Sequence, residues 1–188
     1  MKKIKQELLF EKYILPHYDG IYKYLCRLTE DEEIAIDLTQ ETMEKGWYNI
    51  DKLNSVTTAK AWIFRIATNE YKLYFRAQNA QKRLHMEAER YNEDGELIIE
   101  NISSGEPDPL EHIICIGDRR AIIEALNHID IPYRIILNLY LIEELTFNEI
   151  GEIIEKPNST VQYQYKKGLR LLKEEFDKIV EGRKNGEK

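Results

Sequence analysis

Residues 145–173 read LTFNEIGEIIEKPNSTVQYQYKKGLRLLK, and this stretch decides the fold of the C-terminal part of the chain. Thr146 and Glu149 have the spacing of a capping box, in which each side chain accepts a hydrogen bond from the other residue's backbone N–H. They predict a short helix over 147–154, which the sequence EKPN then ends. A longer helix is expected after that turn. A short helix, a tight turn and a longer helix are typical of a helix-turn-helix.

The longer helix begins with a second predicted capping box, Ser159 with Gln162, and runs to about Phe176. Its outer face carries amides, hydroxyls and cations, and no acid occurs from 158 to 173. Amides pair with base edges and cations hold phosphates, so the start of this helix is expected to enter a major groove of DNA. The expected DNA-contacting residues are Ser159, Thr160, Gln162, Tyr163, Gln164, Lys166 and Lys167. A helix-turn-helix also occurs as a plain packing unit, and the absence of acids favours DNA binding.

A stretch of different composition separates two segments of helical periodicity. Residues 91–112 read YNEDGELIIENISSGEPDPLEH, with helix breakers, seven acids and no Lys or Arg. Breakers and like charges keep such a stretch extended. We therefore predict an all-α protein: an N-terminal helical domain over 1–90, an acidic linker over 91–112, and a helix-turn-helix domain over 113–188. In the last domain a helix is expected over 113–129, with Pro132 in the first turn of the next.

The N-terminal part is predicted to form three or four helices. An apolar helical stripe runs to about residue 28, and Pro16 marks a kink or break in it. Thr29 and Glu32 predict a capping box for a helix that runs to about Tyr48. A third helix is expected to begin near Thr58.

The second of these helices carries an acidic and amide stripe. Asp37, Gln40, Glu41 and Glu44 lie at i, i+3, i+4 and i+7, which places them on one face. Such a stripe on a rigid helix can dock against a basic helical partner. The alternative is a solvated face whose early acids favour the helix dipole. Spacing alone favours this alternative.

The third helix has a basic outer face. Arg65, Asn69, Lys72 and Arg76 recur at i, i+4, i+7 and i+11. Tyr71 and Phe75 lie alongside them. Cations neutralise phosphates, and exposed rings stack on unpaired bases, so this face is suited to single-stranded or melting DNA. The alternative interpretation places Tyr71 and Phe75 in the core.

Composition limits the function further. The 188 residues carry a net charge of −7, which by itself argues against nucleic acid as a binding partner. The acids and cations are segregated along the chain, however, so a local surface can still be basic enough to bind phosphate. The histidines and cysteines have no metal-ligand spacing, and no nucleophile or phosphate-loop signature appears, so no catalysis, metal or cofactor is expected. Cys26 and Cys115 are expected to be buried thiols. No apolar run suits a signal core or a membrane span, which predicts a cytoplasmic protein.

Three stretches together resemble the extracytoplasmic-function (ECF) group of bacterial sigma factors. Residues 35–47 (AIDLTQETMEKGW) are similar to the family's core-polymerase-binding helix, and residues 61–76 (AWIFRIATNEYKLYFR) to the helix that melts and reads the minus-ten promoter element. Residues 145–173 resemble the helix-turn-helix that reads the minus-thirty-five element. These stretches follow the family order. The resemblance implies a DNA-binding specificity subunit of bacterial RNA polymerase, without catalysis of its own.

The resemblance also implies roles for individual residues. Asp37, Gln40 and Glu41 would contact the clamp helices of the largest polymerase subunit, Asn69 and Arg76 would face the minus-ten strand, and the loop over 52–58 would hold a flipped base. The resemblance also implies an anti-sigma factor as a further partner. The sequence departs from the family pattern at Leu73, where an acid is frequent, and at Gln162 and Gln164, where cations are frequent. The promoter sequence is therefore not implied.

Two other functions are to be weighed against this one. A polymerase-independent helix-turn-helix transcription regulator would bind operator DNA by itself, and its acidic helix would be dispensable. A small helical enzyme would need a catalytic or ligand-binding signature that the sequence lacks.

Overall fold

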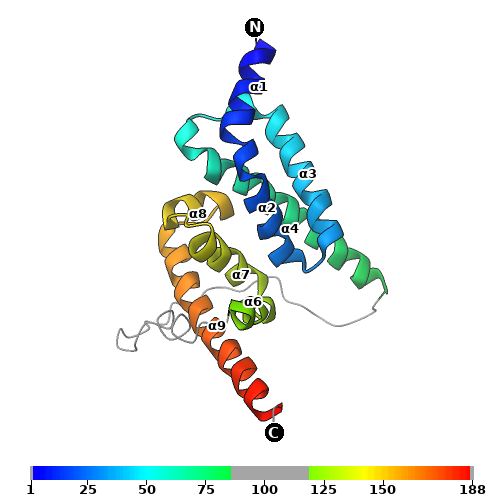
Figure 1. Ribbon diagram of the computed structural model, residues 1–188, viewed down its shortest axis with the longest axis vertical. Helices are drawn as coiled ribbons and strands as arrows, with labels where there is room; N and C mark the ends of the chain where they lie inside the picture. The colour runs from blue at the N-terminus through cyan, green and yellow to red at the C-terminus, as the bar shows by residue number, and fades with distance from the viewer. Residues whose placement is uncertain (1, 86–118, 187–188) are drawn as a thin grey trace.

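The computed structural model describes residues 2–85 and 119–186. Within these ranges the chain is helical and has no strand, which confirms the predicted all-α class (Figure 1). The N-terminal group consists of α1 (Lys2–Tyr13), η1 (Leu15–His17), α2 (Tyr18–Thr29), α3 (Glu32–Tyr48), η2 (Ile50–Lys52), η3 (Val56–Thr58) and α4 (Ala59–His85). The C-terminal group consists of α6 (Arg119–His128), α7 (Ile131–Leu137), η4 (Asn138–Ile142), α8 (Phe147–Ile154) and α9 (Asn158–Gly186). The predicted linker over 91–112, the start of a helix at 113 and Cys115 lie outside the described residues.

The N-terminal group packs α2, α3 and α4 around a shared core. The rings of Tyr24 and Phe64 meet edge to face with their centroids 5.4 Å apart. The Tyr24 hydroxyl lies 2.9 Å from the Thr68 hydroxyl, so this buried polar group has a hydrogen-bond partner. Pro16 lies in the 3-10 turn η1 between α1 and α2, at the predicted break. Cys26, predicted to be a buried thiol, is a free thiol that is half-buried and packs against this core.

The start of α3 differs from the prediction. The N-cap is Asp31, whose carboxylate accepts a hydrogen bond from the Ile34 backbone N–H at 3.1 Å. Thr29 is instead the last residue of α2, and its hydroxyl donates to the Leu25 carbonyl. The predicted box of Thr29 with Glu32 is therefore wrong. The reason is the left-handed turn at Glu30 (φ 57°), which places the new helix two residues later than a Thr29 cap requires.

The helix-turn-helix confirms the first capping box and corrects the second. Thr146 and Glu149 form the reciprocal box at the start of α8, which spans 147–154 as predicted. The turn that follows is tight: a Cβ on Gly151 would lie 2.8 Å from the Lys156 carbonyl oxygen, so glycine is needed there. Helix α9 already begins at Asn158, and Gln162 donates to the Asn158 side chain at 2.7 Å. The predicted Ser159 box is therefore wrong.

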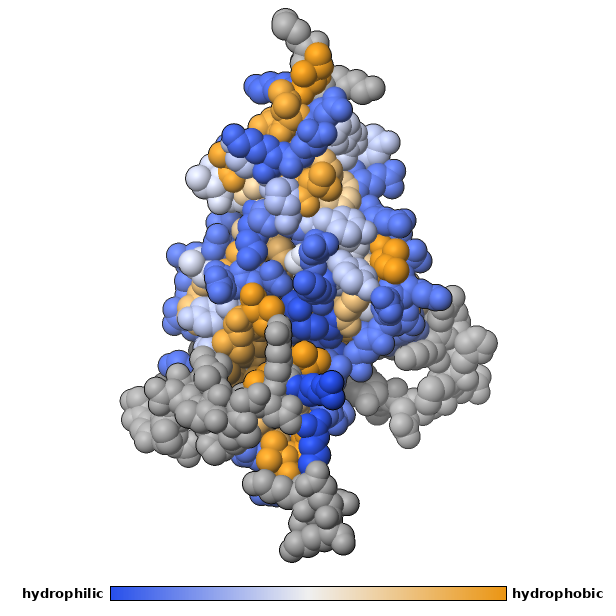
Figure 2. All heavy atoms as spheres, viewed as in Figure 1, coloured by the Kyte–Doolittle hydropathy of each residue, from blue (hydrophilic) through white to orange (hydrophobic). Residues whose placement is uncertain are grey.

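The two groups share one hydrophobic core. Buried apolar residues of α7, η4, α8 and α9 join those of α2, α3 and α4 in a single cluster, and α8 packs against α4. Figure 1 shows α8 and α7 beside the lower part of the N-terminal group. Much of the visible surface is hydrophilic, and hydrophobic patches appear on α1, where Ile4 and Leu8 are exposed, and again over the C-terminal group (Figure 2).

Candidate polymerase and nucleic-acid interfaces

The acidic stripe lies on the outer face of α3. All four of its residues are exposed: Asp37, Gln40, Glu41 and Glu44. The opposite face of α3 packs against the neighbouring helices, because Leu38 and Met43 are buried there. The buried Gly46 on the same helix lets α4 approach closely. A Cβ on Gly46 would lie 2.8 Å from Cδ1 of Ile63 on α4. The stripe is thus carried on a helix that is held against α2 and α4, a rigid setting for docking.

The basic face of α4 is exposed at its two ends and half-buried between them. Arg65 and Arg76 are exposed, whereas Asn69 and Lys72 are half-buried. Burial lowers the pKa of the Lys72 ammonium. Although Arg65 is exposed, it forms an ion pair: its Nη2 lies 2.8 Å from Oε1 of Glu155, at the end of α8.

Of the two rings expected beside the basic face of α4, Tyr71 belongs to the core and Phe75 is half-buried. Tyr71 is 2% exposed and stacks on Phe75 with the ring centroids 6.1 Å apart. Burial raises the pKa of Tyr71 to about 12, so its phenol stays neutral at physiological pH. The interpretation of these rings as a base-stacking platform is wrong for Tyr71. Leu73 is 55% exposed, although the family frequently has an acid there.

A cavity of about 290 Å³ lies between the end of α3 and the basic face of α4. It brings Arg65 and Asn69 together with Trp62, whose ring is half-buried. Its other lining residues are Lys45, Asn49, Lys52, Ile66 and Glu70. Sequence reasoning missed Lys45 and Asn49. The available signal was that Lys45 is the first cation after the acidic run of 30–44.

The outer face of α9 is rotated relative to the prediction. Ser159, Gln162 and Lys166 are exposed, and Thr160, Tyr163 and Lys167 are half-buried. Lys167 is held against α7: its Nζ lies 5.5 Å from the centre of the Tyr133 ring.

Gln164 is the clear exception among the predicted DNA-contacting residues. It is 7% exposed, and its buried Oε1 has no hydrogen-bond partner among the residues that the structure describes. Its position explains why. Gln164 lies three residues after Val161 and four before Gly168, both of which are buried, so it belongs to the inner side of the helix. The prediction that Gln164 faces DNA is wrong.

Replacing Gln164 by Met is expected to leave stability unchanged or to raise it by about 1 kcal/mol, because the change removes a buried oxygen that has no partner and keeps most of the volume. Urea unfolding measures the difference. The exposed Gln162→Met is the control and should stay within about 0.5 kcal/mol of the parent. A clear destabilisation by Gln164→Met would show that the amide has a structural role.

Two structural absences concern the described residues only. Among them, no group of His, Cys, Asp or Glu side chains is arranged to hold a metal ion. Within 2–85 and 119–186, no helix combines the length and the apolar composition that a membrane span requires.

Comparisons with known proteins agree on one family. The sequence profile described as Sigma-70 region 2 matches residues 14–81, and the profile described as Sigma-70, region 4 matches residues 119–172. The chain is 25% identical over 180 residues to the ECF RNA polymerase sigma factor SigW of Bacillus subtilis, with 93% of this chain and 95% of that protein covered. It is 23% identical to the RNA polymerase sigma factor SigV of the same species, with 94% and 96% covered.

Solved structures share the fold. The sigma factor RpoE in complex with the anti-sigma factor NepR, from Bartonella quintana, superposes with a TM-score of 0.63 at 21% identity, covering 94% of this chain and 98% of that one. CnrH in complex with the cytosolic domain of CnrY superposes with a TM-score of 0.59 at 16% identity, covering 89% and 87%. Region 2 contains the acidic stripe and the basic face of α4, and region 4 contains the helix-turn-helix. The chain therefore belongs to the sigma-70 family of RNA polymerase sigma factors, in its ECF group.

Proposed function

We propose that this ECF sigma factor directs promoter recognition and transcription initiation through three separate surfaces. The observation that carries the proposal is the ordered match to region 2 and region 4, with a polar or charged face exposed in each. The acidic stripe of α3 docks on core polymerase through Asp37, Gln40, Glu41 and Glu44. Anions and amides on a rigid helix suit a basic helical partner, and complementary charge favours fast and specific association.

The basic face of α4 is proposed to hold the unpaired minus-ten strand. Arg65, Lys72 and Arg76 neutralise phosphates. The neighbouring cavity of about 290 Å³ has the size of a site for a small ligand, with the Trp62 ring and the Asn69 amide on its wall. A ring and an amide together supply stacking and hydrogen bonding for a base that has left the duplex. Lys52, from the loop expected to hold a flipped base, lines the same cavity.

The start of α9 is proposed to read the minus-thirty-five element in the major groove. The exposed Gln162 reads base edges, with Ser159, Thr160 and Tyr163 beside it, and Lys166 and Lys167 hold phosphates. Gln164 is left out of this set because it is buried.

Replacing Gln162 or Lys166 by alanine is expected to change DNA binding in two different ways. Gln162→Ala should relax discrimination at one base pair by about 1–3 kcal/mol. Lys166→Ala should weaken binding to all sequences equally and reduce the salt slope by about one counterion. Both are measured by titrating duplex minus-thirty-five fragments, at several salt concentrations, with the holoenzyme. The assignment fails if Gln162→Ala lowers affinity without changing base preference.

The proposed partners are bacterial RNA polymerase core, promoter DNA and an anti-sigma factor. Support for the last comes from two structural relatives that are solved in complex with an anti-sigma factor, NepR, or with the cytosolic domain of CnrY. The chain is proposed to act in the cytoplasm, without catalysis, cofactor or metal. A polymerase-independent regulator is not favoured, because such a protein has no need of the sigma-70 region 2 that matches residues 14–81.

A further inference from the structure

Three side-chain amides form a hydrogen-bonded row across the helix-turn-helix. Gln162 Nε2 donates to Oδ1 of Asn158 at 2.7 Å, and Nδ2 of Asn158 donates to Oδ1 of Asn148 on α8. Asn148 and Gln162 are exposed, and Asn158 between them is half-buried. These three residues form the amide network. It connects the first turn of α8 to the beginning of α9, the part proposed to enter the major groove.

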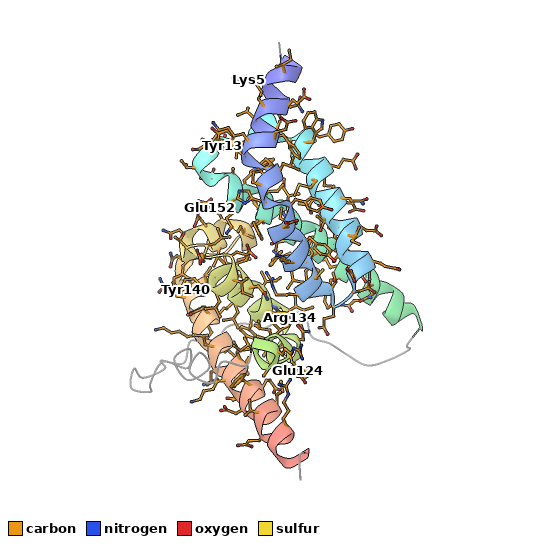
Figure 3. All side chains as sticks on the ribbon, viewed as in Figure 1. Lys5, Tyr13, Glu124, Arg134, Tyr140 and Glu152 are labelled. Carbon is orange, nitrogen blue, oxygen red and sulfur yellow. The ribbon has the colours of Figure 1, made fainter. Side chains whose placement is uncertain are left out.

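The two helices that carry the amide network are packed tightly against each other. At the turn between them, a Cβ added at Gly151 would lie 3.9 Å from the backbone N of Asn158. The Phe147 ring, next to Asn148 in the sequence, meets the Tyr165 ring of α9 edge to face with their centroids 5.2 Å apart. Figure 3 shows α8, which carries the labelled Glu152, next to the start of α9. Asn148 and Asn158 therefore keep a fixed separation.

The amide network fixes the orientation of the Gln162 side chain. A glutamine amide has two N–H donors and one acceptor oxygen, and an unrestrained amide can present either side to a base. The bond to Asn158 engages one N–H and turns the nitrogen toward the start of α9. Asn158 cannot turn its own amide over without losing both bonds, because its oxygen accepts from Gln162 while its nitrogen donates to Asn148. Since Gln162 is exposed, its other N–H and its oxygen are open to a ligand.

A donor and an acceptor held side by side match adenine. In the major groove, adenine presents the N7 acceptor beside the N6 amino donor, and a glutamine amide pairs with both. Guanine presents two acceptors, N7 and O6, so the Gln162 oxygen would face O6 with no proton between them. Thymine and cytosine each present one hydrogen-bonding group there. A fixed amide therefore discriminates between bases more sharply than an amide that turns.

We propose that Asn148 and Asn158 are positioning residues that make Gln162 select adenine at one position of the minus-thirty-five element. This inference rests on the proposed role of α9 in reading that element. Neither asparagine has to touch the base, because Asn158 binds the Gln162 amide and Asn148 binds the Asn158 amide. The preference is a property of this chain. The family frequently has a cation in place of Gln162, and a cation favours guanine.

The test measures base preference with the whole holoenzyme. Bacterial core RNA polymerase is loaded with the full-length chain or a variant and is mixed with duplex DNA that is randomised upstream of a pre-melted segment. The bound duplexes are then sequenced. The parent should enrich adenine about tenfold over the other bases at one upstream position, as a single bidentate pair provides. Gln162→Ala should remove this enrichment.

Removing either asparagine should weaken the adenine preference although the base-reading side chain is still present. Asn158→Ala should reduce the enrichment to about threefold or less, and Asn148→Ala should reduce it in part, because the Gln162 amide then turns. In the Gln162→Ala background, Asn158→Ala should change base preference no further.

Asn158→Asp is the conservative variant that separates positioning from a merely structural role. Its carboxylate still accepts a hydrogen bond from Gln162, so the adenine enrichment should survive. The added negative charge should at the same time weaken binding to all duplexes alike. A residue that only stabilised the helix would not separate base preference from affinity in this way.

Glu152→Gln is the control on α8. Glu152 is exposed and lies four residues after Asn148, outside the amide network. Removing its charge should tighten binding to all duplexes alike and leave the adenine enrichment unchanged. Thermal unfolding of each variant should match the parent within a few degrees, which verifies that the helix-turn-helix is folded.

The outcomes separate this inference from the function on which it rests. Full adenine enrichment in folded Asn158→Ala would overturn the inference, and so would a Gln162-dependent position that prefers another base. In both cases Gln162→Ala still changes base preference, so the proposed role of α9 stands. An equal loss of enrichment in Glu152→Gln would also overturn the inference. If Gln162→Ala changes no position, the proposed role of α9 fails, and this inference fails with it.

Discussion

Alanine at both Asp37 and Gln40 is expected to abolish association with bacterial core RNA polymerase while leaving the fold intact. Both side chains are exposed on α3, so their loss removes no core packing and should change stability by no more than about 0.5 kcal/mol. At an interface, truncating residues that meet a charged partner costs about 2–5 kcal/mol, because the partner group is left unpaired. The dissociation constant should therefore rise by about a hundredfold or more. Fluorescence titration of labelled chain with core enzyme measures it.

The control is Glu11→Ala, which removes an exposed acid from α1 in the same domain. It should bind core enzyme like the parent. Thermal unfolding of the double variant should match the parent within a few degrees. Normal core binding by the double variant would refute the docking role of the stripe, and α3 would then carry only a solvated face.

Phe64→Ala is expected to have the largest effect on stability, a loss of about 3–5 kcal/mol. The ring is fully buried on α4 and packs edge to face on Tyr24. A Cβ added at Gly20 on α2 would lie 3.6 Å from its Cζ, so the ring also fills the space beside that glycine. Its removal leaves a cavity where α2 and α4 meet. Urea unfolding measures the loss as a lower midpoint with a similar slope.

Leu73→Ala is the matched control on the same helix. Leu73 is 55% exposed, so the same kind of truncation should cost no more than about 0.5–1 kcal/mol. Equal losses for the two variants would contradict the packing of α4, because the exposed and the buried positions would then be indistinguishable.

Local chemistry predicted much of the fold. The box of Thr146 with Glu149 located α8 to the residue, and Pro16 marked the break between α1 and α2, because these signals act within four residues. The acidic stripe followed from helical spacing, and its four members are all exposed. The family, inferred from three stretches in order, is confirmed by the matches to region 2 and region 4.

The predictions were wrong where two local signals compete for the same helix start, or where packing against distant residues decides which side chains are buried. Thr29 and Asp31 are both good N-cap residues, and the left-handed turn at Glu30 selected Asp31. Gln164 is polar, but its place between Val161 and Gly168 on α9 turns it inward.

The contacts between the domains had no sequence signal at all. Arg27 and Glu143 are 116 residues apart, and nothing in the periodicity of either helix predicts their pairing. The same holds for Arg65 and Glu155, which are 90 residues apart. A charged residue on a helix face has many possible partners, and only the packed structure selects one.

Reconstituted transcription tests the central claim most directly. Purified chain is mixed with bacterial core RNA polymerase and a pool of genomic DNA fragments, and the transcripts are sequenced. The sigma-factor account predicts that the chain binds core enzyme and that a defined set of transcripts starts only in its presence, downstream of shared minus-ten and minus-thirty-five elements. A chain that never associates with core enzyme and leaves the transcripts unchanged would contradict it.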